Sequence, residues 1–339
     1  MRRPAYLSHS SLALFEKDPD EFYLKYLSEN RPGRLPQTPP MSVGSAFDAK
    51  VKSSLHEAVF GKGADPDYEF EALFESQVEK HNRDFALKAG NYAFQAYKIS
   101  GAYRDLLKLL EQSIEPPRFE CTLTGEIGGA PFMGKPDCRF VLDIEGRISV
   151  VFDWKVKSFC SKYAASPTKG YMLCRDGYGT DDGLGSRSHN TSHKLFMECD
   201  FRGLTINQGF LEDYSSEYAD QCTLYGWLLG EPVGSEETVV FIDELICKPT
   251  GDVTVGEYPL IRVANHRARV REVYQWDLVE RVEHCWNAIT SGHIFTEMTL
   301  EESDARCELL DQVATGLATD GSTEEDFYNQ CTRQQQYKR

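Results

Sequence analysis

The segment 134–155 constrains the fold more than any other part of the chain, because its alternating residues admit one hairpin register. Side chains along a strand point alternately to the two faces of a sheet. With a three-residue loop at 144–146, the apolar side chains of the two strands face one another. A two-residue turn would set apolar against polar side chains along the whole ladder. The sequence therefore predicts a hairpin in which Asp137 lies directly opposite Asp153.

Two facing carboxylates repel each other unless a positive charge lies between them. Mg²⁺ is suited to this position, because it takes one or two carboxylates and keeps several waters. Lys155 lies two residues beyond Asp153 on the same strand face, about 6–7 Å along the strand. An ammonium there could orient a water or stabilise charge on a scissile phosphate. An exposed hairpin end with scattered charges is the alternative, because Asp-x-Lys alone is a common pattern.

The residues GKPD, ending at Asp137, and DWK, ending at Lys155, resemble the core motif of the PD-(D/E)XK nuclease superfamily in its RecB-like and phage-exonuclease branch. Three further stretches resemble that branch's opening Ser-rich helix with its Pro-x-x-Phe segment, its Gly-Ser/Thr-x-x-His helix and its Gln-x-x-x-Tyr helix. They are residues 7–27, 41–51 and 221–229. The resemblance covers scattered blocks between residues 5 and 310, and the hairpin is its most specific part.

The resemblance implies that Asp137 and Asp153 bind Mg²⁺ or Mn²⁺ with help from the Trp154 carbonyl, and that Lys155 is the catalytic lysine. The branch's helical His is Asp48 here. Asp48 is therefore a replacement metal ligand, a sign that the ligand is lost, or a solvated helix position. The candidate supporting or substrate-contacting residues are Glu120, Gln221 and Tyr225, and for the last two a core-facing Tyr with an adjacent amide is the alternative.

The chain has ten cysteines without short-spaced pairs, which is typical of reduced thiols in an intracellular protein. Some relatives in the branch hold an iron–sulfur cluster with one early and three late cysteines. The early position is Asp18 here, and the late cysteines have no Cys-x-x-Cys spacing, so we expect no iron–sulfur cluster. These late cysteines are Cys247, Cys285, Cys307 and Cys331.

The net charge of −16 argues against broad, non-specific coating of nucleic acid but is compatible with a local basic track. No apolar run is long enough to cross a bilayer, and the opening Met-Arg-Arg-Pro is not a secretory signal. We therefore expect no membrane contact and a cytoplasmic location, in the host cytoplasm if the chain is phage-encoded.

We expect one nuclease-like domain over residues 1–316, with a helical part at 1–117 and a long loop insertion at 157–212. A mobile acidic and polar tail follows at 317–339. Helices are expected at 8–15, 18–27, 42–59, 70–78, 85–97, 103–112, 213–229, 271–289 and 300–317, and strands at 119–127, 239–247 and 260–270 beside the hairpin. The strand at 119–127 and the hairpin are expected to form three contiguous antiparallel strands.

Basic side chains of the insertion and of the strand at 260–270 are candidates for DNA backbone contacts. For that strand, a charged edge that resists aggregation is the alternative. The candidates are Lys157, Lys162, Lys169, Arg175, Arg187, Lys194, Arg267 and Arg269. His189 and His193 are four positions apart, but their Ser/Asn-rich context is poor for a helix and therefore for a second metal site.

Together these features predict an α/β fold with a restriction-endonuclease-like core, a small mixed sheet flanked by helices. The expected function is a Mg²⁺- or Mn²⁺-dependent DNA nuclease, an exonuclease rather than a sequence-specific endonuclease, in which a metal-activated water attacks a phosphodiester. A role in DNA processing or recombination, with a recombination-partner protein, follows from the resemblance alone. The alternatives are a non-catalytic DNA-binding or assembly protein with a nuclease-like fold, and a metal hydrolase acting on small phosphoesters.

Overall fold

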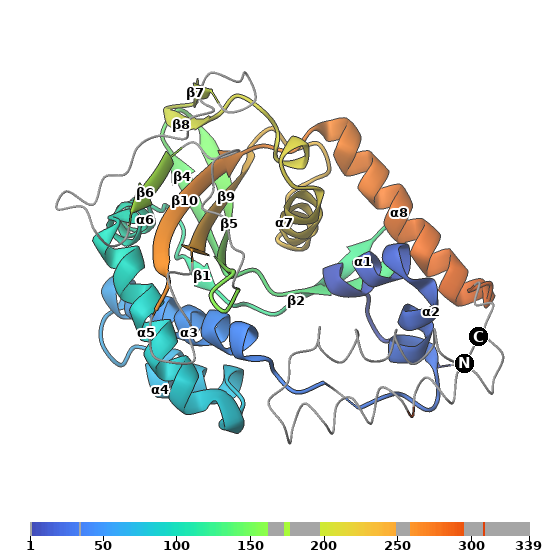
Figure 1. The fold of residues 1–339 in the computed structure, drawn as a ribbon. Helices are drawn as coiled ribbons and strands as arrows, with labels where there is room; N and C mark the ends of the chain where they lie inside the picture. Colours follow the sequence, from blue (N-terminus) through green and yellow to red (C-terminus); the bar gives the residue numbers. More distant parts are fainter. Residues whose placement is uncertain are drawn as a thin grey trace.

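The computed structural model describes residues 2–33, 35–161, 173–176, 197–248, 258–294 and 308. In this part of the chain a six-stranded sheet lies in the middle of the molecule, in the order β1-β4-β5-β9-β10-β6 (Figure 1). Its strands are β1 Arg118–Phe119, β4 Cys138–Asp143, β5 Arg147–Lys157, β9 Thr238–Lys248, β10 Leu260–Ala268 and β6 Leu173–Asp176. β5 and β9 run parallel, whereas the other neighbours in this sheet are antiparallel. The predicted mixed sheet flanked by helices is confirmed.

The hairpin of β4 and β5 has the register that the sequence predicts. Cys138 pairs with Phe152, and Asp143 pairs with Arg147 across the loop at 144–146. Gly146 has a φ of +107°, a conformation that glycine adopts readily because it has no Cβ. The register leaves Cys138 and Phe152 on one face of the sheet and puts Asp153 on the other.

The helices agree closely with the periodicity of the sequence. α1 begins where Ser8 caps it through a capping box, and Asp18 caps α2 with Pro19 at its first position. The π-helical turn Tyr23–Leu27 continues α2. The helices are α1 His9–Lys17, α2 Pro19–Phe22, α3 Pro39–Phe60, α4 Phe70–Gln77, α5 Arg83–Ile99, α6 Ala102–Glu111, α7 Ser216–Leu228 and α8 Glu272–Ser291.

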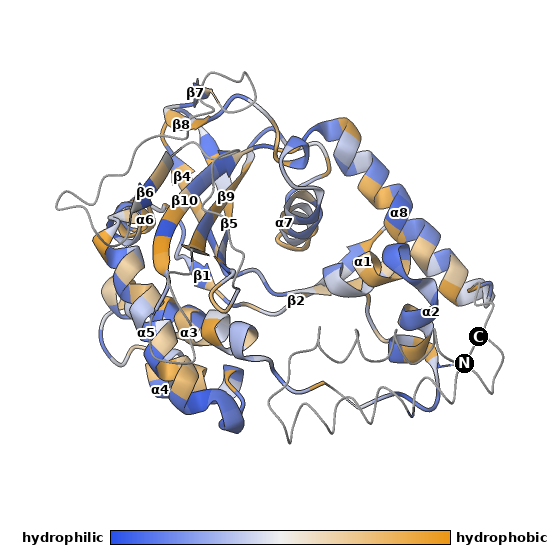
Figure 2. Cartoon of the chain, viewed as in Figure 1, coloured by the Kyte–Doolittle hydropathy of each residue, from blue (hydrophilic) through white to orange (hydrophobic). Residues whose placement is uncertain are grey.

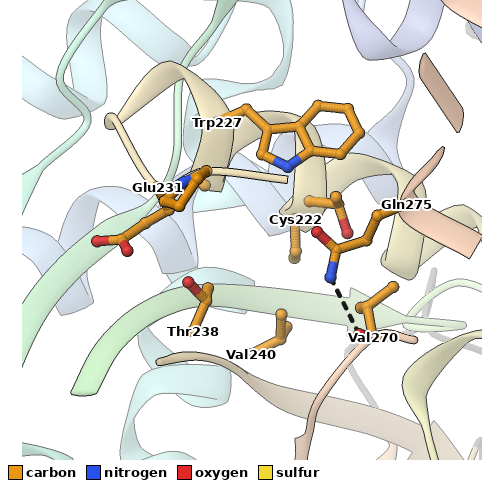
Figure 3. Close-up of a pocket in the computed structure, with 10 residues that line it drawn as sticks. Cys222, Trp227, Glu231, Thr238, Val240, Val270 and Gln275 are labelled. Atoms are coloured by element: carbon orange, nitrogen blue, oxygen red, sulfur yellow. Dashed lines mark hydrogen bonds between the residues drawn. The ribbon is translucent and has the colours of Figure 1, made fainter. Parts of the chain in front are cut away.

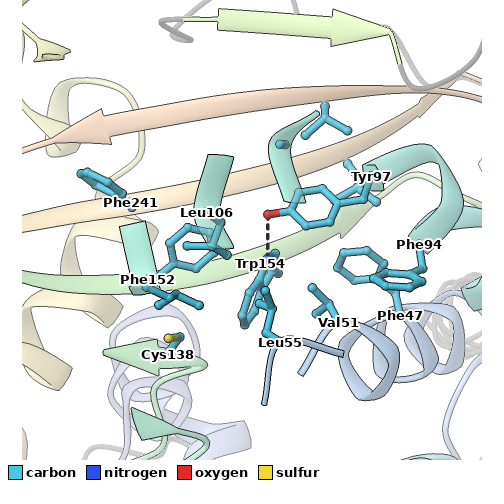
Figure 4. Packing of buried hydrophobic residues seen from close by; sticks show 14 of the residues in the cluster. Phe47, Val51, Leu55, Phe94, Tyr97, Leu106, Cys138, Phe152, Trp154 and Phe241 are labelled. Atoms are coloured by element: carbon cyan, nitrogen blue, oxygen red, sulfur yellow. Dashed lines mark hydrogen bonds between the residues drawn. The ribbon is translucent and has the colours of Figure 1, made fainter. Parts of the chain in front are cut away.

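One face of the sheet is covered by α3, α5 and α6, and the opposite face by α7 (Figure 1). Aromatic and aliphatic side chains fill the first interface, among them Phe47, Tyr97 and Phe152, which are fully buried (Figure 4). On the α7 side, Val151 and Ile242 pack against the helix. Asp153 and Lys155 of β5 therefore lie on the face that α7 covers.

A second apolar cluster lies beside the sheet, where α1 and α8 pack side by side (Figures 1 and 2). It includes Leu12, Phe22 and Val282 and the two-stranded sheet of β2 Leu123–Ile127 and β3 Ala130–Gly134. Leu7 extends this small sheet through a bridge to Phe132. The first and last described helices are thus joined by the strand pair that leads into the hairpin.

The predicted strand at 119–127 is wrong, because the chain turns at Glu120, which has a φ of +47°. β1 ends at Phe119 and pairs with β4, whereas β2 pairs with β3 in a separate sheet. The expected set of three contiguous antiparallel strands is therefore not formed. α3 also begins earlier than predicted, because Pro39 occupies its first turn, and α7 begins later, after the 3₁₀ turn Leu211–Asp213.

Part of the insertion at 157–212 forms strands where the sequence indicated mainly loop. β6 joins the edge of the large sheet, and β7 Glu198–Phe201 pairs with β8 Leu204–Asn207. The expected helix at 300–317 and tail at 317–339 fall on residues outside the described part, except Glu308, and so do His189, His193, Cys307 and Cys331. Within the described residues, no helix combines the length and apolar character that a membrane span requires.

Candidate active site

Asp137 and Asp153 meet at the end of the hairpin. Their side chains hydrogen-bond to each other, and Asp137 Oδ2 also accepts from the Trp154 backbone N–H at 3.0 Å. Burial and the Asp137 charge raise the pKa of Asp153 well above its ordinary value. Burial acts in the same direction on Asp137, but the Lys52 ammonium, the bond from Asp153 and the Trp154 N–H lower its pKa to about 2. The pKa values of the two acids are therefore driven apart, upward for Asp153 and downward for Asp137.

Lys155 is held between the acids and α7. Its Nζ lies 2.9 Å from Asp153 Oδ2 and donates to Gln221 Oε1 at 2.9 Å. Gln221 in turn donates through Nε2 to the Tyr225 hydroxyl at 3.0 Å. Although burial lowers the pKa of Lys155, the charges of Asp153 and Asp137 outweigh it and raise that pKa above its ordinary value. The lysine thus remains an ammonium whose direction is fixed from two sides.

Gly134 explains why α7 can come this close to the hairpin. A Cβ on this residue would lie 2.7 Å from Tyr225 Cδ1 and 2.8 Å from Leu228 Cδ1. Such distances are shorter than carbon atoms tolerate, so only glycine fits at this point of β3. The glycine of the GKPD stretch therefore contributes close packing, which in turn places the Gln221–Tyr225 pair over Lys155.

Lys52 is the site residue that the sequence did not single out. Its side chain has no exposed surface, and its Nζ lies 2.7 Å from Asp48 Oδ2, 3.0 Å from Asp137 Oδ1 and 3.3 Å from Glu120 Oε1. The spacing of Asp48 and Lys52 on one helix face is the only signal that the sequence offered. A pairing with Asp137, 85 positions away, has no local signature.

Glu120 and Asp48 are joined by a second bridge. Gln77 donates from Nε2 to Glu120 Oε2 at 3.0 Å and to Asp48 Oδ2 at 3.1 Å. Lys135 lies 3.2 Å from Glu120 Oε1, and the Glu120 N–H donates to the Asp137 carbonyl. Burial raises the pKa of Asp48 to about 7, against the opposing effect of the Lys52 charge. Asp48 is thus a partner of Lys52 and not a solvated helix position.

The basic residues proposed for DNA contact that fall within the described ranges do not form one track. Arg267 is buried, with NH1 2.9 Å from Asp243 Oδ1 and its guanidinium over the Phe241 ring, so it does not lie on a DNA-facing surface. Arg175 pairs with Asp105 of α6 at 2.7 Å and is largely covered.

Two other candidates lie nearer the surface. Lys157 is 46% exposed in its side chain and pairs with Glu244 at 2.9 Å, and the Arg269 guanidinium lies 4.7 Å from the Phe201 ring centre. Lys162, Lys169, Arg187 and Lys194 lie outside the described residues. Among the described residues, Lys157 and Arg269 are therefore the candidates left for backbone contact.

A divalent cation fits the hairpin end only in part. Asp137 and Asp153 offer carboxylate oxygens, and an ion could offset the repulsion between them. The oxygens of Asp48 and Glu120 are instead directed to Lys52. In keeping with this, no group of three or more His, Cys, Asp or Glu side chains in the described ranges is arranged to hold a metal. Two protein carboxylates with waters would suffice for Mg²⁺.

A cavity behind the site is too small to bind substrate. It lies between α7, β9 and the start of α8, has a volume of about 20 Å³ and is lined by residues such as Cys222, Thr238 and Gln275 (Figure 3). That volume holds about one water molecule. The hydroxyls of Thr223 and Thr238 line it without a hydrogen-bond partner, which suits a water and not a nucleotide.

No family model matches the chain, and no curated protein matches it. Among solved structures it is similar to a protein from Eubacterium rectale described as a candidate exonuclease, at 15% identity and a TM-score of 0.38 over 84% of this chain and 80% of the other. It is also similar to KSHV SOX in a complex with RNA, at 12% identity and a TM-score of 0.25 over 84% and 95% of the chains. Likenesses this distant carry no argument, so the function is argued from the side chains.

Proposed function

We propose that this protein is a divalent-metal-dependent nuclease that hydrolyses phosphodiester bonds of DNA, with Asp137, Asp153 and Lys155 as its catalytic residues. One observation carries the proposal. The buried carboxyl group of Asp153 meets the half-buried carboxyl group of Asp137, and an ammonium lies 2.9 Å from Asp153. Holding like charges this close costs free energy, so a fold that does so at a partly exposed end of the sheet points to use of the pair.

The raised pKa of Lys155 assigns it the role of a donor. An ammonium that stays charged at neutral pH cannot take a proton from water, so Lys155 does not serve as the general base. It can donate a hydrogen bond to a non-bridging phosphate oxygen and oppose the charge that develops there. Gln221 and Tyr225 act as positioning residues, because they fix the direction of the ammonium through hydrogen bonds.

Asp137 and Asp153 are the residues that would hold Mg²⁺ or Mn²⁺, with the Trp154 carbonyl as a further oxygen. When bound, the ion would supply Lewis-acid polarisation of the phosphate. The pKa of Asp137 is lowered, whereas that of Asp153 is raised by burial and by the Asp137 charge, so binding of the ion would favour the deprotonated form of Asp153. Asp48 and Glu120 support the site through Lys52, which they surround.

DNA as substrate and attack from strand ends follow from the resemblance of the motif. Lys157 suits a backbone contact, because it lies two residues beyond Lys155 on the same strand face and its side chain is partly exposed. A role in DNA processing or recombination, in an intracellular setting, belongs to the same proposal.

End-labelled linear DNA and closed circular DNA, each incubated with Mg²⁺ or Mn²⁺, test this function. We expect loss of the linear substrate, persistence of circles, and a fall of at least 100-fold in rate for Lys155→Ala. Lys25→Ala, which removes an ammonium that pairs with Glu21 on α2, is the matched control and should cut normally. Equal persistence of linear DNA with all three proteins contradicts the proposal, and cutting of circles contradicts the exonuclease assignment.

A non-catalytic DNA-binding or assembly protein is the second candidate, and Lys52 is the observation that favours it. Its ammonium already neutralises part of the acidic cluster. Calorimetric titration with Mn²⁺ distinguishes the two candidate functions. The nuclease requires a bound ion, and Asp153→Asn should weaken the binding of that ion. A wild-type protein that takes up no Mn²⁺ supports the second candidate.

A further inference from the structure

Three carboxylates from three separate segments converge on the Lys52 ammonium. Asp48 comes from α3, Glu120 follows β1, and Asp137 precedes β4, with oxygens 2.7, 3.3 and 3.0 Å from Nζ. The Lys52 side chain is 0% exposed, so protein oxygens replace the water that an ammonium normally binds. The geometry is that of a cation held by surrounding oxygen ligands, except that this cation is attached to the chain.

The surroundings of Lys52 are built to keep it there. Glu120 adopts the left-handed φ of +47°, which residues other than glycine rarely adopt. This backbone turn directs the Glu120 carboxylate to the Lys52 ammonium. Gln77 ties Glu120 to Asp48 through one amide group. Three ammonium groups (Lys52, Lys135 and Lys155) thus face four carboxyl groups (Asp48, Glu120, Asp137 and Asp153).

We propose that Lys52 is an internal cation that takes the place of one metal ion, so that the site binds at most one divalent cation, at Asp137 and Asp153. The inference rests on the proposed metal-dependent function. It assigns Asp48 and Glu120 to Lys52 and not to the ion. A second divalent ion bound by Asp48, Glu120 and Asp137 would lie about as close to the Lys52 ammonium as to its own ligands. The two positive charges would therefore repel each other.

Lys52→Met tests the inference, because methionine keeps the length of the side chain and removes its charge. The number of bound Mn²⁺ ions is measured by calorimetry and by electron paramagnetic resonance of free Mn²⁺. We expect the variant to bind one ion more than the wild-type protein. We also expect its melting temperature to fall in chelator and to recover with Mn²⁺ more than that of the wild type. An unchanged ion count overturns the proposal.

A second measurement does not depend on the folding of Lys52→Met. In the wild-type background, Asp48→Asn should change the affinity for Mn²⁺ by less than about threefold, because Asp48 faces Lys52, whereas Asp153→Asn should weaken it by at least tenfold. A large loss with Asp48→Asn, or two ions in the wild-type protein, overturns the inference. The outcomes also distinguish a failure of the inference about Lys52 from a failure of the proposed function. A protein that gains one ion on Lys52→Met but cuts no DNA supports the role of Lys52 and contradicts the nuclease.

Discussion

Asp137 and Asp153 come together across neighbouring strands, and burial and the Asp137 charge raise the pKa of Asp153 well above its ordinary value. A raised pKa favours the protonated form of Asp153, whereas a metal ion is bound by the deprotonated form. Binding of an ion by both carboxylates is therefore expected to release a proton.

Binding of Mn²⁺ at neutral pH should release about one proton per ion. The observed binding enthalpy will then vary with the ionisation enthalpy of the buffer, which calorimetry in phosphate, HEPES and Tris measures. Affinity should rise with pH until Asp153 is ionised in the free protein. Identical enthalpies in all three buffers would mean that Asp153 is not protonated before the ion binds.

The stability of the metal-free protein should also depend on Asp48. Burial raises the pKa of Asp48 to about 7, well above the ordinary value of an aspartate, so the folded state binds a proton that the unfolded state has lost. The stability that this group contributes is complete below the unfolded pKa and is lost as pH rises to about 7. Urea unfolding in chelator from pH 4 to 8 measures it. Asp48→Asn should become steadily more stable relative to wild type up to about pH 7, and a constant difference would contradict the shift.

The hydrogen bonds beneath β5 give a prediction independent of the metal. The fully buried Tyr97 hydroxyl donates to Asp243 Oδ2 at 2.6 Å and accepts from Trp154 Nε1 at 3.3 Å (Figure 4). Tyr97→Phe leaves both partners short of a bond and should lower the free energy of unfolding by about 1–3 kcal/mol. Tyr103→Phe is the matched control, because the Tyr103 hydroxyl bonds only to Ser54 in a half-buried setting. Equal losses of unfolding free energy in the two variants would show that burial of the Tyr97 hydrogen bonds does not increase their contribution to stability.

The sequence predicted those features whose causes are local. The alternation of β4 and β5 admits one register, and Ser8 and Asp18 begin helices through bonds within three residues. The left-handed turn at Glu120 could not be predicted, because the Glu120 side chain contacts Gln77 and Lys135, which lie elsewhere in the sequence. A buried lysine is equally unexpected, since lysine is almost never fully buried unless it is paired.

The burial of Arg267 is another feature that could not be predicted from the sequence. The alternating arginines after Leu260 indicated an exposed basic strand, but the burial of Arg267 depends on Asp243 of the neighbouring strand β9. Composition gives the charge of such a strand, whereas the partner strand determines which of its side chains reach solvent. The candidate site was therefore located from the hairpin, and its basic surroundings were not.

Substitutions at two glycines of the helices that cover the sheet distinguish the effect of close packing on stability from that of helix propensity. A Cβ on Gly90 of α5 would lie 2.6 Å from the Ala46 Cβ and 2.9 Å from backbone atoms of α3, whereas a Cβ on Gly44 of α3 meets nothing within 4 Å. Gly90→Ala should force α3 and α5 apart and destabilise the fold by about 1–3 kcal/mol or more. Gly44→Ala should stabilise it by about 0.5–1 kcal/mol, because alanine favours helix. Thermal unfolding measures both, and stabilisation by Gly90→Ala would contradict the packing of these helices.

Gly134 joins packing to catalysis, and its substitution should affect rate more than stability. An added Cβ at 2.7 Å from Tyr225 Cδ1 must displace the ring, which moves the hydroxyl that Gln221 bonds and so releases Lys155 from one of its two holders. Because misplacement by about 1 Å can cost 10²-fold, Gly134→Ala should lower kcat for DNA cleavage by about 10–100-fold with KM little changed.

Gly125→Ala is the matched control for Gly134→Ala, because Gly125 lies in the same small sheet and faces the same helix. Its added Cβ would meet only the end of the Leu228 side chain, at 3.0 Å, and that end can move aside. This variant should keep its rate. Tyr225→Phe removes the hydroxyl and leaves the ring in place, so it should lose part of the rate that Gly134→Ala loses. If Gly134→Ala keeps full activity while Lys155→Ala does not, α7 does not position the lysine through Tyr225, and Lys155 is held by Asp153 alone.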